Sequence, residues 1–333
     1  MYSELTSQEW AKWISNYPEA HLLQTDKWGS LKSGFGWKVR YIRNEQCGAM
    51  ILFRHLPFGL KIAYLPKGPV GTGWMSLFNG LDHLCKQENV IFLRIEPDAW
   101  EGENEKELKV LVQFAPQSVE PIQPRRTIVI DLDGDENTWL MRMKQKTRYN
   151  IRLAIKNGLR VVESQDIGVF ASLMQITGER DGFGVHRSNY YQLAYELFSA
   201  ENQCTLLLAS YKDRPIAGIM VFKRGSRAWF LFGGMSEEEK NRMPAYLVQW
   251  EAMRWAAAHG CTEYDLWGAP DFDKEILEAN FQSRSDGLWG VYRFKRGFGG
   301  VVKRTTGAWD RIYQHSFYRM YQWYSKRRRS IIG

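Results

Sequence analysis

The sequence predicts an α+β protein made of two tandem domains of one type, each with a mixed, mostly antiparallel sheet flanked by helices. Three observations predict this class. The order hairpin, strand, helix, strand occurs twice, at a separation far longer than that of solenoid repeats. Between the two copies, residues 116–126 are rich in proline and polar residues, as a linker would be. The chain has 333 residues, 44% of them hydrophobic, which is enough apolar material for two cores.

The first copy follows two short helical stretches. Residues 38–43 and 47–54 are apolar or alternating around the polar turn Asn44-Glu45-Gln46, and together they predict a β-hairpin. In order, we expect helices over 8–16 and 26–33, strands over 38–43, 47–54 and 61–66, a helix over 75–87 and a strand over 90–96.

The second copy repeats this order. A turn containing Pro215 joins its first two strands. Its helix has Pro244 near the first turn and Gly260 at the end, the positions that these residues favour. Apolar residues recur along this helix at spacings of three and four, at Leu247, Trp250, Met253 and Ala257. In order, we expect strands over 205–211, 216–222 and 228–232, a turn at Gly233-Gly234, a helix over 244–260 and a strand over 263–267.

The charge of the chain favours an anionic partner. A net charge of +8 and a pI near 9.2 suit phosphate, RNA or an acidic lipid surface, and we expect no DNA partner. The four cysteines form no C-x-x-C pair, so neither a zinc ribbon nor a disulfide framework is indicated. The first residues lack the apolar core of a signal peptide, and no stretch is apolar and long enough to span a bilayer. We therefore expect a cytoplasmic protein.

The C-terminal residues 317–330 mix aromatic side chains with a basic run. Such a segment rests on an anionic membrane, binds RNA or is a solvated helix end. Elsewhere, the commonest NTPase, zinc-protease and hydrolase classes are excluded, because no G-x-x-x-x-G-K-S/T, H-E-x-x-H or G-x-S-x-G segment occurs. The six histidines are dispersed, and for His186, in a polar loop, we expect a surface role.

Four separated segments, in their joint order, resemble the FemABX family, whose members transfer amino acids from aminoacyl-tRNA to peptidoglycan precursors. The segments are LLQTDKWGSLK at 22–32, MKQKTRYNIRLA at 143–154, the stretch from GGMS at 233–236 through PAYLVQW at 244–250 to YDLWG at 264–268, and YRFKRGFGG at 292–300. The resemblance implies two GNAT-like domains without the long helical arm of the larger members. It places domain 1 at 1–125, with a C-terminal helix over 308–333 packed back on it, and domain 2 at 126–307.

The acceptor implied by this resemblance is a pyrophosphate ester. Arginine binds phosphate with a planar fork and lysine acts as a point charge. The resemblance implies that Lys32, Thr147 and Arg148 hold the phosphates, with Arg152 as a neighbour. A solvated charged helix face is the alternative for these cations. Further substrate-binding candidates in the resembling segments are Trp28, Gly233, Gly234, Tyr246 and Phe294.

Transfer from an ester to an amine passes through a tetrahedral centre with a developing oxyanion, which a cation or hydrogen-bond donors must stabilise. The resemblance gives this place to Lys295, as the lysine that contacts the aminoacyl-tRNA end. The acceptor amine must also lose a proton. Asp265 and Glu96 end matching strands and are candidate bases, although carboxylates at such positions often serve as caps or ion-pair partners. Proton transfer assisted by the tRNA ribose or phosphate is the other route.

We expect an aminoacyltransferase that uses aminoacyl-tRNA as a co-substrate, with no cofactor and no metal, and acts on the peptide amine of UDP-MurNAc-pentapeptide or lipid II. It is expected in the cytoplasm or peripherally at the inner face of the membrane. The acetyl-CoA signature of GNAT enzymes is missing where Gly233-Gly-Met-Ser-Glu-Glu-Glu-Lys stands, which disfavours acetyl-CoA as the donor. The alternatives are a GNAT-like N-acyltransferase for another amine (a peptide, an antibiotic or a polysaccharide sugar) and a non-catalytic tRNA-binding protein.

Overall fold

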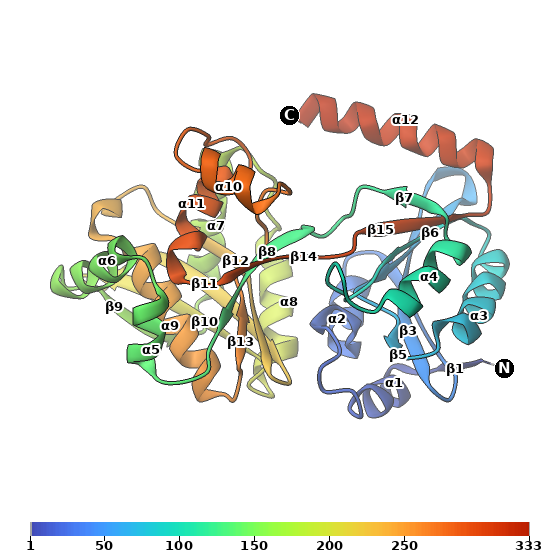
Figure 1. Ribbon diagram of the computed structural model, residues 1–333, viewed down its shortest axis with the longest axis horizontal. Helices are drawn as coiled ribbons and strands as arrows, with labels where there is room; N and C mark the ends of the chain where they lie inside the picture. Colours follow the sequence, from blue (N-terminus) through green and yellow to red (C-terminus); the bar gives the residue numbers. More distant parts are fainter. Residues whose placement is uncertain (1, 333) are drawn as a thin grey trace. The chain divides into compact units, whose positions relative to one another are not determined.

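The computed structural model describes residues 2–332, and the side chains of residues 2–323. The chain forms two compact units (Figure 1). Unit 2 is Pro124–Arg304, and unit 1 is the chain on either side of it. Each unit has its own mixed sheet and its own hydrophobic core. The predicted α+β class, with two mostly antiparallel sheets flanked by helices, is confirmed.

The sheet of unit 1 has the strand order β1-β2-β3-β4-β6-β15-β7, and β5 pairs with β3. Neighbouring strands are antiparallel except β4 and β6, which are parallel and are separated in sequence by α3. The strands are β1 Ser3–Leu5, β2 Trp37–Arg43, β3 Cys47–His55, β4 Lys61–Pro66, β5 Val70–Gly71, β6 Val90–Glu96, β7 Gln117–Val119 and β15 Ala308–Ile312. The helices are α1 Ser7–Ile14, α2 Asp26–Ser33, α3 Trp74–Gln87, α4 Glu105–Phe114 and α12 His315–Ile332, with short 3-10 helices η1 Leu22–Gln24 and η2 Pro57–Gly59.

The core of unit 1 follows from the periods of its elements. Alternate residues of β3, from Cys47 to Phe53, enter the same cluster as α3. The helix buries residues three and four apart, namely Trp74, Leu77, Phe78, Leu81, Leu84 and Cys85. The intervening face of β3 packs elsewhere, because a Cβ on Gly48 would meet Trp10 and Trp13 of α1. Both faces of β3 are therefore buried, which explains its nearly continuous apolar run.

The end of the chain corrects one prediction. We expected a helix over 308–333, but Ala308–Ile312 is strand β15, which pairs with β6 and β7, and the helix begins only at His315. The physical reason is the buried Asp310. Arg94 of β6 binds its carboxylate with two hydrogen bonds of 2.8 Å each, and the Tyr318 hydroxyl donates a third of 2.8 Å. A charge buried in this way fixes residue 310 in the sheet.

The sheet of unit 2 has the order β14-β8-β13-β12-β11-β10-β9, and β12 and β13 are its parallel pair. Helix α9 separates these two strands in sequence. The strands are β8 Arg126–Asp131, β9 Arg160–Ser164, β10 Cys204–Tyr211, β11 Arg214–Arg224, β12 Arg227–Met235, β13 Glu263–Asp265 and β14 Val301–Arg304. The helices are α5 Glu136–Arg142, α6 Gln145–Lys156, α7 Ile167–Asp181, α8 Ser188–Ser199, α9 Pro244–Ala258, α10 Lys274–Asn280 and α11 Trp289–Lys295, with short 3-10 helices η3 Lys240–Arg242 and η4 Arg296–Phe298.

Helices cover both faces of this sheet. Along β11, Ile219 and Val221 join the cluster that contains α9. The alternating residues face α7 and α8, because a Cβ on Gly218 would meet Phe170, and Phe222 makes an edge contact with Phe198. Since α7 and α8 pack on strands, they form no projecting arm. Among the described residues, no helix combines the length and apolar character that crossing a bilayer requires.

The turn predicted at Gly233-Gly234 is wrong. Both residues belong to β12, where they pair with Ile219 and Gly218 of β11. A Cβ on Gly234 would lie 2.6 Å from backbone atoms of Leu173 in α7. Helix and strand approach so closely only because this residue is glycine, so packing accounts for its small size.

Candidate functional site

A pocket of about 500 Å³ in unit 2 brings together several of the predicted residues. It lies where the first turn of α6 meets α9, α11 and η4. The residues that line it are Lys144, Lys146, Thr147, Tyr246, Phe281, Gln282, Gly290, Arg293, Phe294, Arg296 and Gly297. Thr147, Tyr246 and Phe294 are thus found in one place, although they come from segments up to 147 residues apart in the chain (294 − 147).

The pocket is strongly basic. Lys144 and Lys146 stand at the N-terminus of α6, an end that carries a partial positive charge and has no acidic residue in its first turn. Arg293 donates to the carbonyls of Phe281 and Gln282, at 2.8 and 3.0 Å. No carboxylate lines the pocket. Four cations in a concave site favour an anionic ligand.

One of these cations, Arg296, is neutralised by a carboxylate that does not line the pocket. The guanidinium of Arg296 pairs with Glu278, with 3.0 Å between Nε and the carboxylate. The same carboxylate accepts a 2.8 Å hydrogen bond from the Tyr292 hydroxyl. These contacts hold η4 against α10 and leave Arg296 stacked over the ring of Phe281 at 3.7 Å. Arg296 therefore fixes the wall of the pocket as well as adding charge.

The rest of the wall is aromatic. The rings of Tyr246 and Phe294 meet edge-to-face at 5.0 Å, and Phe294 meets Phe298 at 5.1 Å. Burial raises the pKa of the Tyr246 hydroxyl, which therefore stays neutral near pH 7. Aromatic faces next to cations are the combination that binds the bases and phosphates of a single-stranded nucleic acid end.

Gly297 marks the closest approach in this pocket. A Cβ at this position would lie 2.2 Å from the Oγ1 of Thr147. The backbone of Gly297 also accepts a 2.9 Å hydrogen bond from the N–H of Lys144, so η4 and the first turn of α6 are held together directly. Thr147 is buried, and we conclude that it shapes the pocket through this contact.

We predict that Gly297→Ala lowers the free energy of unfolding by about 1–3 kcal/mol, because the added methyl group overpacks the contact with Thr147. Adding Thr147→Ala to the same chain should restore most of the loss. The matched control is Gly290→Ala in α11, where a Cβ meets nothing closer than 3.8 Å. Denaturant unfolding of the unsubstituted protein and these three variants checks this, and equal losses with and without Thr147→Ala would contradict it.

Lys295 follows Phe294 in α11, but its side chain is not part of the pocket lining. It is 5% exposed, and its Nζ donates to the carbonyls of Trp267 and Gly268 at 2.6 and 2.9 Å. Burial lowers the pKa of Lys295 to about 7, although the nearby charge of Asp265 opposes the shift. The amine therefore changes charge near neutral pH.

Asp265 lies beside the same segment. Its Oδ1 accepts hydrogen bonds from the Thr127 hydroxyl and from the N–H of Trp267, the latter at 2.7 Å. Trp267 has a φ of +57°, which is rare for a bulky residue. Asp265 thus binds the N–H of Trp267, and Lys295 binds its carbonyl. Strained backbone of this kind is concentrated at functional sites.

Unit 1 contains a second group of cations. Lys32 in α2 lies 4.8 Å from the ring centroid of Trp28, and Arg54, at the end of β3, lies 5.3 Å from that of Trp37. Burial, and secondarily the charge of Arg54, lower the pKa of Lys32 to about 8. Sequence reasoning found Lys32 and Trp28 but missed Arg54. Because the charge of Arg54 is close enough to lower the pKa of Lys32, an anion placed between the two would stabilise both cations.

Three further predicted residues do not line the pocket of unit 2. Arg148 donates through Nη1 to the carbonyls of Leu140 and Met143 and closes the end of α5. Arg152 is exposed on α6 and does not line the pocket. Glu96 belongs to unit 1, where its buried carboxylate accepts the backbone N–H groups of residues 122 and 123, and burial raises its pKa.

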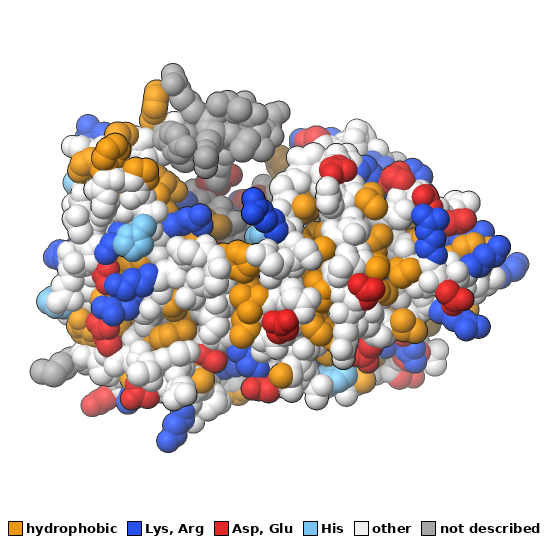
Figure 2. Space-filling view, turned by 180° about the vertical axis from the view of Figure 1, so that it is seen from behind, with side chains coloured by type: hydrophobic (Ala, Val, Ile, Leu, Met, Phe, Trp, Pro, Cys, Tyr) orange, Lys and Arg blue, Asp and Glu red, His pale blue; other side chains and the backbone are white. Residues whose placement is uncertain are grey.

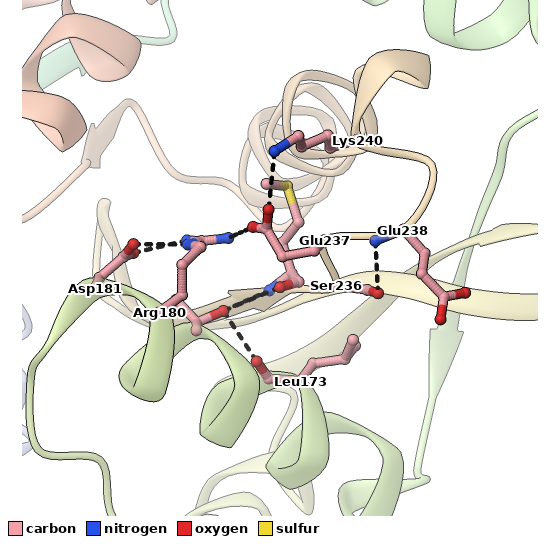
Figure 3. Close-up of polar contacts among 9 residues, drawn as sticks. Leu173, Arg180, Asp181, Ser236, Glu237, Glu238 and Lys240 are labelled. Carbon is pink, nitrogen blue, oxygen red and sulfur yellow. Dashed lines mark hydrogen bonds and ion pairs between the residues drawn. The ribbon is translucent and has the colours of Figure 1, made fainter.

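Ion pairs join the loop after β12 to the end of α7 (Figure 3). Arg180 binds Asp181 at 2.6 Å and Glu237 at 2.8 Å, and Lys240 binds Glu237 at 2.9 Å. Arg242 pairs with Glu239 in the same loop. Arg180, Lys240 and Arg242 are therefore each paired with a carboxylate. Within the described residues, no cluster of three His, Cys, Asp or Glu side chains is placed to hold a metal ion.

Known proteins resemble this chain over nearly its whole length. A profile of the FemAB family matches residues 5–213 and 203–326. A lipid II:glycine glycyltransferase from Staphylococcus epidermidis is 23% identical over 401 residues, covering 95% of this chain and 94% of its own. The crystal structure of FemX superposes with a TM-score of 0.83 at 22% identity, covering 96% of this chain and 99% of that one. A tandem GNAT protein from the clavulanic acid biosynthesis pathway gives a TM-score of 0.54 at 11% identity, covering 93% and 97%.

Proposed function

The chain belongs to the FemAB family and is an acyltransferase, and from that premise we propose that it moves an amino acid from aminoacyl-tRNA to the peptide amine of a peptidoglycan precursor. The acceptor is UDP-MurNAc-pentapeptide or lipid II, and the reaction belongs to cross-bridge synthesis in the cell wall. Lipid II is the acceptor named for the staphylococcal relatives. The protein works in the cytoplasm, in contact with the inner face of the membrane when its acceptor is lipid-linked.

The pocket of unit 2 is the observation that carries the proposal. Its cations Lys144, Lys146 and Arg293, the N-terminus of α6 and its aromatic wall suit the 3′ end of a charged tRNA, which offers phosphates, a ribose and a flat base. The Lys32 and Arg54 pair in unit 1 suits the pyrophosphate of the acceptor. Each ligand thus has a site whose charge is opposite to its own.

In the proposed reaction, the acceptor amine attacks the ester carbonyl carbon and a C–N bond forms. The ester C–O bond breaks, the ribose hydroxyl leaves as the alcohol, and the amine gives up its proton. A protonated Lys295 stabilises the oxyanion of the tetrahedral centre, because a buried cation acts strongly where water is excluded. Asp265 is a candidate base, and in the structure it orients Trp267. The bonds of Glu96 to the backbone favour a structural role for that carboxylate.

The test is a transfer assay with purified protein, a mixture of charged tRNAs and UDP-MurNAc-pentapeptide, repeated with lipid II. Mass spectrometry should find one added amino-acid residue on the precursor. Acetyl-CoA in place of charged tRNA should give no product, because the acetyl-CoA signature of GNAT enzymes is missing at residues 233–240. Acetylated product, or no transfer to either acceptor, would overturn the proposal.

We predict that kcat falls as the pH rises through about 7, because the pKa of Lys295 is lowered to about 7 and only the protonated amine carries the charge that stabilises the oxyanion. Below that pH the ammonium dominates and this loss is absent. In Lys295→Arg the side chain stays charged, so the alkaline fall should disappear even if the maximal rate is lower. A pH profile of kcat for both proteins checks this, and an unchanged alkaline limb in Lys295→Arg would assign the titration to another group.

A further inference from the structure

An apolar surface on unit 1 lies outside the sites already described. The hairpin between β3 and β4 carries Phe58 at its tip, and this side chain is 96% exposed. Its backbone has a φ of +64°, in the left-handed region that bulky residues avoid. An aromatic ring that is both fully exposed and held in a strained turn gains nothing for the stability of the isolated protein.

The neighbouring helix α12 adds to this surface. Phe317, Met320 and Trp323 are 42%, 53% and 56% exposed. They recur every three residues, on the side of the helix that faces away from the buried Tyr318. Helix α12 therefore buries one stripe and presents a second apolar stripe to solvent.

A small hydrophobic cluster joins the hairpin to the helix. Leu56 and Leu60, on either side of the tip, pack in the same cluster as Tyr318 and Tyr321 of α12, around Phe92 of β6. The tip and the helix are therefore neighbours within unit 1. Figure 2 shows hydrophobic side chains gathered on the surface of this unit, at the upper left of the view. We call Phe58, Phe317, Met320 and Trp323 the apolar edge.

The charges around the apolar edge are positive. Arg54 precedes the tip and is exposed, and Arg319 is exposed on α12. Neither residues 52–62 nor residues 315–332 contain a single Asp or Glu, whereas residues 326–329 read Lys-Arg-Arg-Arg. The side chains of this last run lie outside the described residues, so its role rests on the sequence alone. Apolar side chains in a basic surround are typical of proteins that bind anionic lipid surfaces.

We propose that the apolar edge docks unit 1 on an anionic membrane, with Phe58 and the outer stripe of α12 inserted among the lipids. Lys32 and Arg54 then lie in the same unit as the membrane contact, which suits an acceptor whose pyrophosphate sits at the bilayer surface. The choice of a lipid-linked acceptor rests on the proposed function, whereas binding to lipid can be measured without any reaction.

The experiment is flotation of the full chain with vesicles of phosphatidylcholine, with and without phosphatidylglycerol. The protein should bind the anionic vesicles, less so at high salt. Phe58→Ser should weaken binding about tenfold, as expected for withdrawing one aromatic side chain from an apolar phase. Replacing all four residues of the apolar edge with serine should weaken it about a hundredfold or more. The matched control is Met141→Ser in unit 2, which removes a side chain that is 78% exposed and should leave binding unchanged.

Activity separates this inference from the proposed function. Phe58→Ser should keep full transfer to soluble UDP-MurNAc-pentapeptide and lose transfer to lipid II in vesicles. If the protein transfers to neither acceptor, vesicle binding still decides the inference. Absence of binding to anionic vesicles, or equal binding by the four-residue variant, would overturn it. Two other results would also overturn it, if the unsubstituted protein does not bind vesicles. Loss of tRNA binding in the four-residue variant would assign the surface to RNA, and loss of self-association would assign it to a second copy.

Discussion

Replacing Lys295 with alanine is expected to lower kcat for transfer by about 10²–10³-fold, the effect of removing one donor from an oxyanion site. The amine is buried and already oriented by the carbonyls of Trp267 and Gly268, so it needs no rearrangement to meet developing charge. KM for the acceptor should change little, because the amine lies outside the pocket lining and the phosphates have their own cations in unit 1.

Loss of structure is the competing explanation for an inactive Lys295 variant. Two carbonyls would lose their donor, and unpaired buried groups cost about 1–3 kcal/mol each. Lys295→Ala leaves a space that ethylammonium can fill, whereas Lys295→Met fills that space with an uncharged chain. Added ethylamine should therefore restore part of the rate of the alanine variant and none of the methionine variant. Lys274→Met, at an exposed lysine of α10, is the control. If Lys295→Ala retains the full rate, or if its melting temperature falls with no rescue, Lys295 has no direct part in transfer.

The fold was predictable where one local period decides the structure. Helix α3 repeats apolar residues at spacings of three and four, and β6 is a short apolar run before Glu96, so both were expected within one residue of their ends. The prediction fails at β15. The resemblance placed residues 308–312 in a helix, whereas the bond that fixes the strand, between Asp310 and Arg94, joins residues 216 positions apart.

The candidate site was predictable only through the resemblance to a family, and then in part. The segments at 143–154, 244–250 and 292–300 all reach the pocket, which brings Thr147, Tyr246 and Phe294 together. Arg148 was chosen for its charge, and no sequence pattern shows that its guanidinium closes the end of α5. Arg54 was missed because only the packing of helix α2 on strand β3 brings it near Lys32. The type of a side chain indicates the chemistry it can perform, whereas the direction in which the side chain points depends on tertiary packing.

The largest effect on stability is expected from Asp310→Ala, which should destabilise unit 1 by about 3–5 kcal/mol. The carboxylate is fully buried and satisfies two N–H donors of Arg94 and the Tyr318 hydroxyl. Removing it leaves a largely buried guanidinium without its counter-charge, and that uncompensated charge dominates the cost. Hydrogen exchange of the β6 and β15 amides measures the loss in unit 1 itself, without assuming that both units unfold in one transition.

Two further variants identify the cause of that loss. Arg94→Met combined with Asp310→Leu removes both charges and keeps the volume, so it should recover most of the stability, because a buried ion pair adds little over apolar packing. Asp286→Ala breaks a comparable pair with Arg284 at an exposed position and should change stability far less, since water already screens that pair. If Asp310→Ala and Asp286→Ala cost the same, the buried pair does not fix β15. If only the double variant is stable, the strand is fixed by avoiding an unpaired charge.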